Sequence, residues 1–249
     1  MKLQFLGVLI AILLAACAAP QSRPPAPAAD ATSDVMPPLP QPSPQLLRYT
    51  NDLKVHQLAF LALEHIWWDS YTYCASMQSR DWTVVESFTV TFDASGKPIN
   101  GAWFDEAVMS GCGYSHKVSM FTAAIDGKLK QLRALPGTTY TDFLLQHGSV
   151  PYAIDAAEGI VSPTCDNADI YGSVRRIVDT RFVGFEGAPF PDAPPGRQAR
   201  PWREDWVVAG CDAHALVVMH FVPDPNGGTR FIANPDETKR IDWTASGLQ

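Results

Sequence analysis

The segment WFDEAVMSGC at residues 103–112 recurs as WREDWVVAGC at residues 202–211, and this pair decides the fold prediction. Both segments place tryptophan, two acids, an apolar pair and Gly-Cys at the same spacing, 99 positions apart (202 − 103). The agreement continues downstream, where Val118 and Met120 correspond to Val217 and Met219. Upstream, the run VVES at 84–87 matches IVDT at 177–180. This ordered series of matches indicates an internal duplication.

Strands are predicted around both segments, because apolar and polar residues alternate and turn residues separate the runs. The predicted strands are 83–92, 99–109, 116–125 and 128–134 in the first copy, and 174–185, 202–209, 214–222 and 229–233 in the second. A helix is predicted over 46–68, and two short helices over 142–148 and 149–159. We therefore expect an α+β fold of two tandem related modules, 45–139 and 140–249, each a helix plus a small antiparallel β-sheet stapled by a disulfide.

The first residues have the pattern of an export signal. Lys2 precedes an uncharged run from Leu3 to Leu14, which is too short to span a bilayer as a permanent helix. The run ends in Leu14-Ala15-Ala16-Cys17, which resembles the lipobox of bacterial lipoproteins. The resemblance implies that residues 1–16 are removed as a signal peptide and that Cys17 becomes a lipidated N-terminus carrying acyl chains such as palmitate. The alternative is an ordinary secretory signal in which this cysteine is incidental.

The resemblance also implies a location in the cell envelope. Ala18 follows the cysteine in place of an aspartate that would retain the protein at the inner membrane, so an outer-membrane anchor facing the periplasm is expected. Residues 17–44 hold nine of the 21 prolines, which favours an extended tether lifting the folded part off the membrane. A docking site for a proline-recognition module is the alternative for this stretch.

Four cysteines remain once Cys17 is assigned to the lipid. An even number of cysteines in an exported protein predicts disulfide bonds, although three pairings are possible and spacing alone selects none. Duplication favours one pair within each module, Cys74–Cys112 and Cys165–Cys211. Metal ligation is the rival use of these thiols, but the chain has no C-x-x-C pair. No metal ion and no cofactor are expected.

No specific catalytic motif occurs in the chain, so only weak catalytic candidates can be named. They are His116, His214, Glu106 and Glu204. Adjacent acids on a strand point to opposite faces, so Asp105 and Glu106 cannot act together. An acid from each module could still form a dyad that hydrolyses a polysaccharide.

Two groups of residues are candidates for binding. The aromatic group is Trp68, Tyr71 and Tyr73, whose flat rings could stack on sugars. The basic group is Arg197, Arg200 and Arg203, in or just after a long loop at 185–201 that interrupts the repeat. The alternative for the loop is a tolerated insertion with a solvated surface. Trp103 and Trp202 recur in both copies, which favours a core role for them.

Charge and composition limit the classes of function. A formal net charge of −7 argues against a nucleic-acid binder, which would need a basic face. The leading hypothesis is an outer-membrane-anchored, periplasm-facing lipoprotein without enzymatic activity that binds an envelope protein or glycan. The alternatives are a periplasmic hydrolase of cell-wall or polysaccharide material, and an inhibitor or immunity-type lipoprotein that uses the 185–201 loop.

Overall fold

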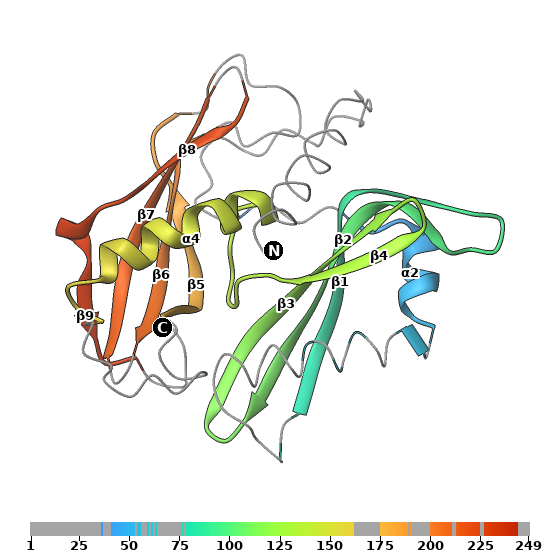
Figure 1. Ribbon diagram of the computed structural model, residues 1–249, viewed down its shortest axis with the longest axis horizontal. Helices are drawn as coiled ribbons and strands as arrows, with labels where there is room; N and C mark the ends of the chain where they lie inside the picture. The colour runs from blue at the N-terminus through green and yellow to red at the C-terminus, as the bar shows by residue number, and fades with distance from the viewer. Residues whose placement is uncertain are drawn as a thin grey trace, which may run out of the picture.

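The protein is built mainly from two antiparallel β-sheets (Figure 1). The computed structural model describes residues 36, 41–52, 54, 55, 59, 61, 63, 76, 78–161, 175–188, 190, 200–210, 213–224 and 227–243. The sheets have four and five strands, whereas the two α-helices whose bounds are described span only 7 and 15 residues. The predicted α+β fold class, with a helix plus a small sheet in each module, is therefore wrong, because β-structure dominates the architecture.

The first sheet has the order β1-β2-β3-β4. Its strands are β1 (Gln78–Phe92), β2 (Pro98–Gly111), β3 (Tyr114–Ile125) and β4 (Lys128–Arg133). Asp126 and Gly127, with φ of 49° and 74°, form the two-residue turn between β3 and β4, since both residues adopt the positive φ that such hairpins require. The four strands predicted in this part of the chain are confirmed, and β1 starts earlier than predicted.

The second sheet has the order β5-β6-β7-β8, and β9 also pairs with β7, at residues 214–216, which precede the part paired with β8. Its strands are β5 (Arg176–Phe185), β6 (Trp202–Gly210), β7 (Ala213–Pro223), β8 (Thr229–Ala233) and β9 (Lys239–Ile241). The sequence analysis did not predict β9 or the 3-10 helix η2 (Pro235–Glu237) before it. The two repeated segments lie in β2 and β6, the second strand of each sheet.

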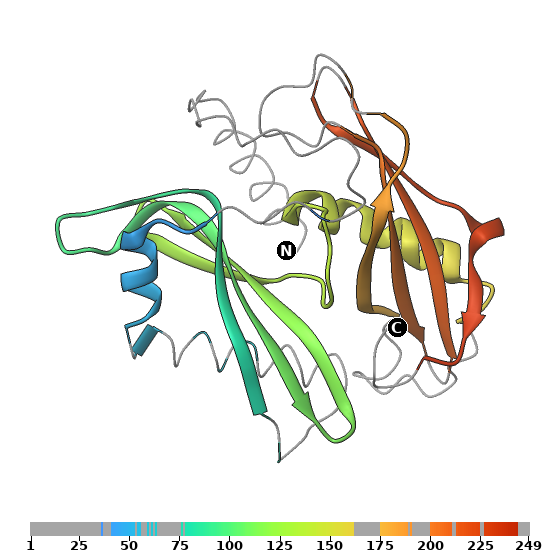
Figure 2. The same cartoon turned by 180° about the vertical axis from the view of Figure 1, so that it is seen from behind.

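Helix α4 (Phe143–Ala157) lies across one face of the second sheet (Figures 1 and 2). Asp142 caps its start by accepting a hydrogen bond from Leu145 N. The prediction of two short helices is wrong, because α4 runs without a break through Gly148 and Pro151. Burial of α4 offsets the roughly 3 kcal/mol that an interior proline costs: Ala153 and Ala157 pack in the core of the second sheet, and Phe143 stacks on Phe121 of the first sheet. The buried residues of the helix recur every three or four positions. They are Phe143, Gln146, Ser149, Ala153 and Ala157.

Helix α2 (Pro44–Thr50) packs against β1 and ends sooner than the helix predicted over 46–68. Asn51 caps its end, and Asp52 Oδ1 accepts hydrogen bonds from Lys54 N and Val55 N to begin a new helical turn. Asparagine and aspartate favour such caps, which explains the interruption. Most of 53–68 lies outside the described residues. Within the described part of the chain, no helix has the length and apolar character needed to cross a bilayer.

Each sheet has its own apolar core. Trp202, Trp206 and Phe221 are fully buried between the second sheet and α4, and Trp202 stacks on Phe221 with ring centroids 4.9 Å apart. In the first sheet, Trp103 packs with Leu46 of α2. The predicted core role of Trp103 and Trp202 is confirmed, since they are 2% and 0% exposed.

The connector, residues 134–141, joins the two sheets and is bonded to both. Its Gly137 N donates to Lys117 O in β3, and its Thr138 pairs with the edge of β5 through Thr138 N to Thr180 O and Phe182 N to Thr138 O. Gly137 has a φ of +96°, and a Cβ atom there would overlap Thr180 O. A glycine is therefore required where the connector runs beside the edge of β5.

Candidate functional site

The adjacent acids of β2 point to opposite faces of the first sheet, as strand geometry requires. Asp105 is buried on the face that carries Trp103, whereas Glu106 lines a cleft on the other face. The equivalent pair of β6 divides in the same way. Glu204 accepts hydrogen bonds from the connector, and Asp205 faces Arg181 and Arg203.

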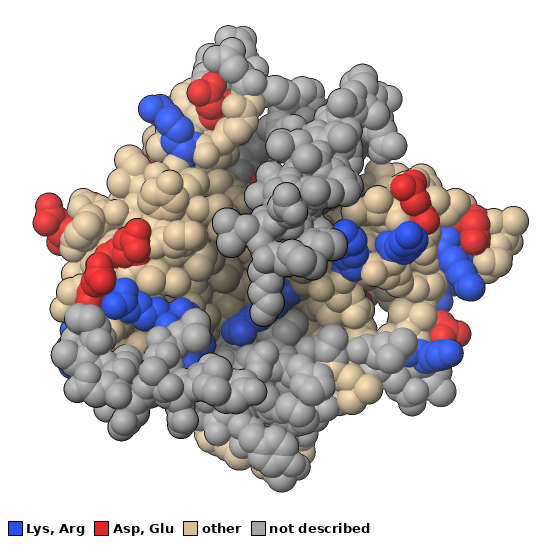
Figure 3. Space-filling model, viewed as in Figure 1, with Lys and Arg blue, Asp and Glu red and all other residues tan. Residues whose placement is uncertain are grey.

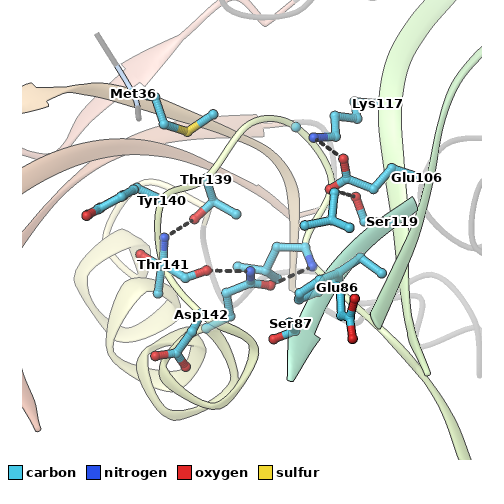
Figure 4. Close-up of a pocket in the computed structure, with 16 residues that line it drawn as sticks. Met36, Glu86, Ser87, Glu106, Lys117, Ser119, Thr139, Tyr140, Thr141 and Asp142 are labelled. Atoms are coloured by element: carbon cyan, nitrogen blue, oxygen red, sulfur yellow. Dashed lines mark hydrogen bonds and ion pairs between the residues drawn. The ribbon is translucent and has the colours of Figure 1, made fainter. Parts of the chain in front are cut away.

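The cleft lies between the first sheet, the connector and the start of α4, and has a volume of about 220 Å³ (Figure 4). Phe104 from β2 and Tyr140 from the connector give it apolar surface. Glu106, Lys117 and Ser119 supply polar groups on the side of the sheet. A site of this kind, with apolar walls and a few placed polar groups, is suited to holding a small ligand or one side chain of a partner.

The polar wall of the cleft is organised around Glu106. Lys117 Nζ lies 2.7 Å from Glu106 Oε2, and Ser119 Oγ donates to Oε1 at 3.3 Å (Figure 4). Register explains the arrangement, since Glu106 pairs with Ser119 across β2 and β3 and Lys117 lies two residues away on the same face. The Lys117 side chain is 26% exposed and lines the cleft, so a bound ligand would lie beside it.

Glu86 forms a rigid part of the cleft wall. It is 8% exposed, and its carboxylate accepts from Ser43 N and Val90 N, each at 2.7 Å. These bonds tie the start of α2 to an irregular stretch of β1, where the register with β2 shifts after Glu86. Both oxygens are thus occupied by backbone donors, which suits a structural role.

Glu204, a catalytic candidate from the sequence, is fully buried and accepts six hydrogen bonds from the protein. The donors are Thr139 Oγ1, Tyr140 N, Thr141 N, Thr141 Oγ1, Trp202 Nε1 and Trp206 Nε1, at 2.7–3.1 Å. Glu204 lies behind the connector that walls the cleft, whereas Glu106 lines the cleft itself. The structure therefore does not bring Glu106 and Glu204 together as a solvent-facing dyad.

Asp105 occupies the position equivalent to Glu204 but has fewer donors. Its Oδ2 accepts from Trp103 Nε1 at 3.0 Å and from Thr122 Oγ1 at 3.5 Å, and Oδ1 has no hydrogen-bond partner among the described residues. Burial raises the pKa of Asp105 from 3.8 to about 6, although the hydrogen bonds from Trp103 and Thr122 oppose the rise.

His116 and His214 are brought together, but not in the cleft. Both rings lie against Trp243, each with a centroid distance of 5.1 Å, and the His116 ring is within 19° of parallel to the indole. Burial lowers the pKa of His214, and the nearby charge of Arg176 lowers it further. This geometry packs one histidine from each sheet on a C-terminal tryptophan, which indicates a structural contact.

The described arginines of the basic group are engaged in local contacts. Arg203 lies 3.3 Å from Asp205, which Arg181 also contacts at 3.1 Å. Arg200 donates to Gly187 O, and its guanidinium lies 5.0 Å from the Phe185 ring centroid. These contacts hold the ends of the 185–201 loop against the second sheet.

Several predicted residues lie outside the described part of the chain. They are Cys17, Cys74, Cys165, Cys211, Trp68, Tyr71, Tyr73 and Arg197. Cys112 is disulfide-bonded, while the predicted pairings remain predictions because the other cysteines fall outside. Among the described residues, no group of three or more His, Cys, Asp or Glu side chains is placed to hold a metal ion.

Sequence reasoning missed Lys117, Ser119 and Tyr140 of the cleft, and also Trp243. A signal for two of them was present, because the hairpin register places Lys117 and Ser119 on the face of Glu106. No local pattern could have indicated Tyr140 or Trp243, since their positions depend on how the two sheets meet.

Comparisons with protein-family models, with curated proteins and with solved structures find no match to this chain.

Proposed function

We propose that this chain is an outer-membrane-anchored lipoprotein, facing the periplasm, whose folded part binds another envelope component in the cleft. The lipobox-like run ending at Cys17 and the proline-rich stretch after it support the anchor and the spacer. Several acyl chains give stable membrane attachment, and a tether of this composition lets the folded part reach a partner away from the surface.

The observation that carries the binding proposal is the Glu106–Lys117 pair in the wall of the cleft. Lys117 has three N–H donors and uses one on Glu106, so a bound group can accept from the others. Phe104 and Tyr140 offer apolar and aromatic contact beside this pair. This combination is suited to orienting a ligand that has an apolar part and a hydrogen-bond acceptor.

Binding is preferred over hydrolysis because of where Glu204 lies. An acid–base pair for glycoside hydrolysis must flank the scissile bond, and Glu204 is sealed from solvent by six protein donors. The inhibitor alternative depends on 185–201, of which 189 and 191–199 lie outside the described residues. That alternative stays a prediction.

The anchor is tested with the full chain carrying Cys17→Ser. We expect the wild-type protein to fractionate with membranes and to carry acyl chains detectable by mass spectrometry of its N-terminal peptide. The variant should lack the acyl chains and lose the membrane attachment that they provide. An unchanged N-terminal peptide mass in the two proteins would contradict lipidation.

The cleft is tested by photo-crosslinking in cells that express the full chain. A photoreactive residue at Ser87, on the cleft wall, should form a crosslink to an envelope component. The same residue at Arg230, exposed on β8, should not. Lys117→Met should reduce the Ser87 crosslink, because the ammonium donors are lost while most of the apolar stem remains. Equal crosslinking from both positions would contradict a site in the cleft.

A further inference from the structure

The outer edge of β4 is a sheet edge away from the cleft. In the described part of the chain, β4 pairs only with β3, so it ends the order of the first sheet. Five of its six residues, Lys128 to Leu132, are exposed, including Leu129 at 43% and Leu132 at 42%. A strand in this position presents backbone groups that another extended chain can pair with.

The register shows which backbone groups face outward. The two-residue turn makes Ile125 and Lys128 the closing hydrogen-bonded pair, and Ala134 N donates to Ser119 O further along. Even-numbered residues of β4 therefore bond to β3, and the N–H and C=O groups of Leu129 and Gln131 point away from the sheet. The contact between His147 Nε2 and Arg133 O, at 3.2 Å, agrees with this alternation and marks one end of the open stretch.

The charge of the edge limits the kind of chain that it can take. Residues 128–133 (KLKQLR) contain three cations and no acid. Lys128, Lys130 and Leu132 share one face of the sheet, and Leu129 lies on the other. Lysine and arginine atoms are exposed over the region of Figure 3 that β4 occupies in Figure 1. An added strand would place the side chains of one face opposite Lys128 and Lys130.

We propose that the β4 edge binds an acidic, extended polypeptide segment of another protein by strand addition. Backbone hydrogen bonds to Leu129 and Gln131 hold the segment, and acidic side chains on one of its faces pair with Lys128 and Lys130. Apolar residues on its other face cover Leu129. This mode of recognition combines main-chain pairing for affinity with alternate side chains for specificity. It is independent of the ligand proposed for the cleft.

The test measures binding of short synthetic peptides to the full chain by isothermal titration calorimetry. One peptide alternates glutamate with valine, and a second replaces glutamate with lysine. Two further versions of the acidic peptide carry N-methyl groups on alternate amides, one version for each edge of the strand. We expect the acidic peptide to bind and the lysine peptide not to bind. Only one N-methylated version should lose binding, because only one edge of the added strand donates to β4.

Variants of β4 separate strand addition from a general charge effect. Gln131→Pro removes an outward N–H, which an edge strand tolerates, and should weaken the acidic peptide about tenfold. Lys130→Glu should weaken the acidic peptide and allow the lysine peptide to bind, a gain that loss of folding cannot produce. Arg230→Glu on β8 is the matched control and should change neither affinity.

The proposal is overturned by any of three results. The first is that the acidic peptide fails to bind; the lysines would then serve only to prevent edge-to-edge aggregation. The second is that both N-methylated versions bind as well as the unmethylated acidic peptide; the contact would then be purely electrostatic. The third is that Arg230→Glu weakens binding of the acidic peptide as much as Lys130→Glu does; the peptide would then bind somewhere other than the β4 edge.

Discussion

Asp105 and Glu204 hold equivalent positions in β2 and β6, and each accepts a hydrogen bond from the indole of the tryptophan two residues earlier. Both carboxyl groups are almost fully buried, and neither forms an ion pair with a described residue. They differ in the number of donors that surround them. Six donors satisfy Glu204, whereas one oxygen of Asp105 lacks a described partner. Buried carboxyl groups without enough donors favour the neutral form.

Glu204→Gln should lower the free energy of unfolding by about 3 kcal/mol, because the amide nitrogen would face donors that now point at an oxygen. The measurement is urea unfolding followed by circular dichroism. Glu158→Gln is the control, since Glu158 is 60% exposed and its pairing with Arg175 contributes less than about 1 kcal/mol. If both variants changed the free energy of unfolding equally, the hydrogen bonds around Glu204 would not require a carboxylate.

Asp105→Asn should change how stability depends on pH. The unfolded chain loses the Asp105 proton near pH 4, whereas the native state keeps it to about pH 6. The native state thus binds more protons in this window, and wild-type stability falls as pH rises through it, by about 3 kcal/mol. The asparagine variant never ionises, so its stability relative to wild type should increase from pH 4 to pH 7. A constant difference across urea titrations at these pH values would contradict the raised pKa.

The connector shows how one short element can join two sheets. It bonds to β3 through Gly137, to β5 through Thr138, and to Glu204 of β6 through Thr139–Thr141. It also walls the cleft, so the geometry of the cleft depends on where the connector pairs with the edge of β5. Gly137 restricts this path, because a Cβ atom at that position would overlap Thr180 O.

Gly137→Ala should destabilise the protein by at least about 2 kcal/mol, because the new methyl group would overlap Thr180 O and the Asp179 carboxylate at a positive φ. Gly148→Ala is the matched control. Gly148 lies in α4 with no atom within 4 Å of the position a Cβ would take, so alanine should stabilise the helix by about 0.5–1 kcal/mol. Thermal unfolding of both variants measures the effects. Destabilisation by both substitutions would point to a loss unrelated to the connector.

The strands could be predicted from the sequence because their signals are local. Alternation and turn residues such as Asp126-Gly127 defined most strand boundaries to within a few residues. Helix α4 was divided in the prediction because Gly148 and Pro151 are local breaking signals, and its continuity comes from burial against a sheet that is distant in sequence. Glu106 of the cleft was identified, but its partner Lys117 required the strand register.

The two sheets meet through few elements, and Trp243 is one of them. Its indole lies between His116 of β3 and His214 of β7, so a single side chain after β9 contacts both sheets. It also packs on the buried cluster of Val178, Val207, Ala209 and Leu216. Both histidines are catalytic candidates from the sequence, because the sequence does not show what their rings pack against. Their shared neighbour indicates that they help to hold the molecule together.

Trp243→Ala should weaken the contact between the sheets and lower the free energy of unfolding by about 2 kcal/mol. This loss is smaller than that for a fully buried tryptophan, because the Trp243 indole is only half-buried. Hydrogen exchange followed by mass spectrometry should show faster exchange at both 114–118 and 213–217. Tyr152→Ala is the control, because Tyr152 is 57% exposed and its aromatic contact is with Phe231 of the second sheet. It should leave exchange at 114–118 unchanged. If Trp243→Ala increased exchange only in the second sheet, the indole would be a local part of that core and the sheets would be held by the connector without it.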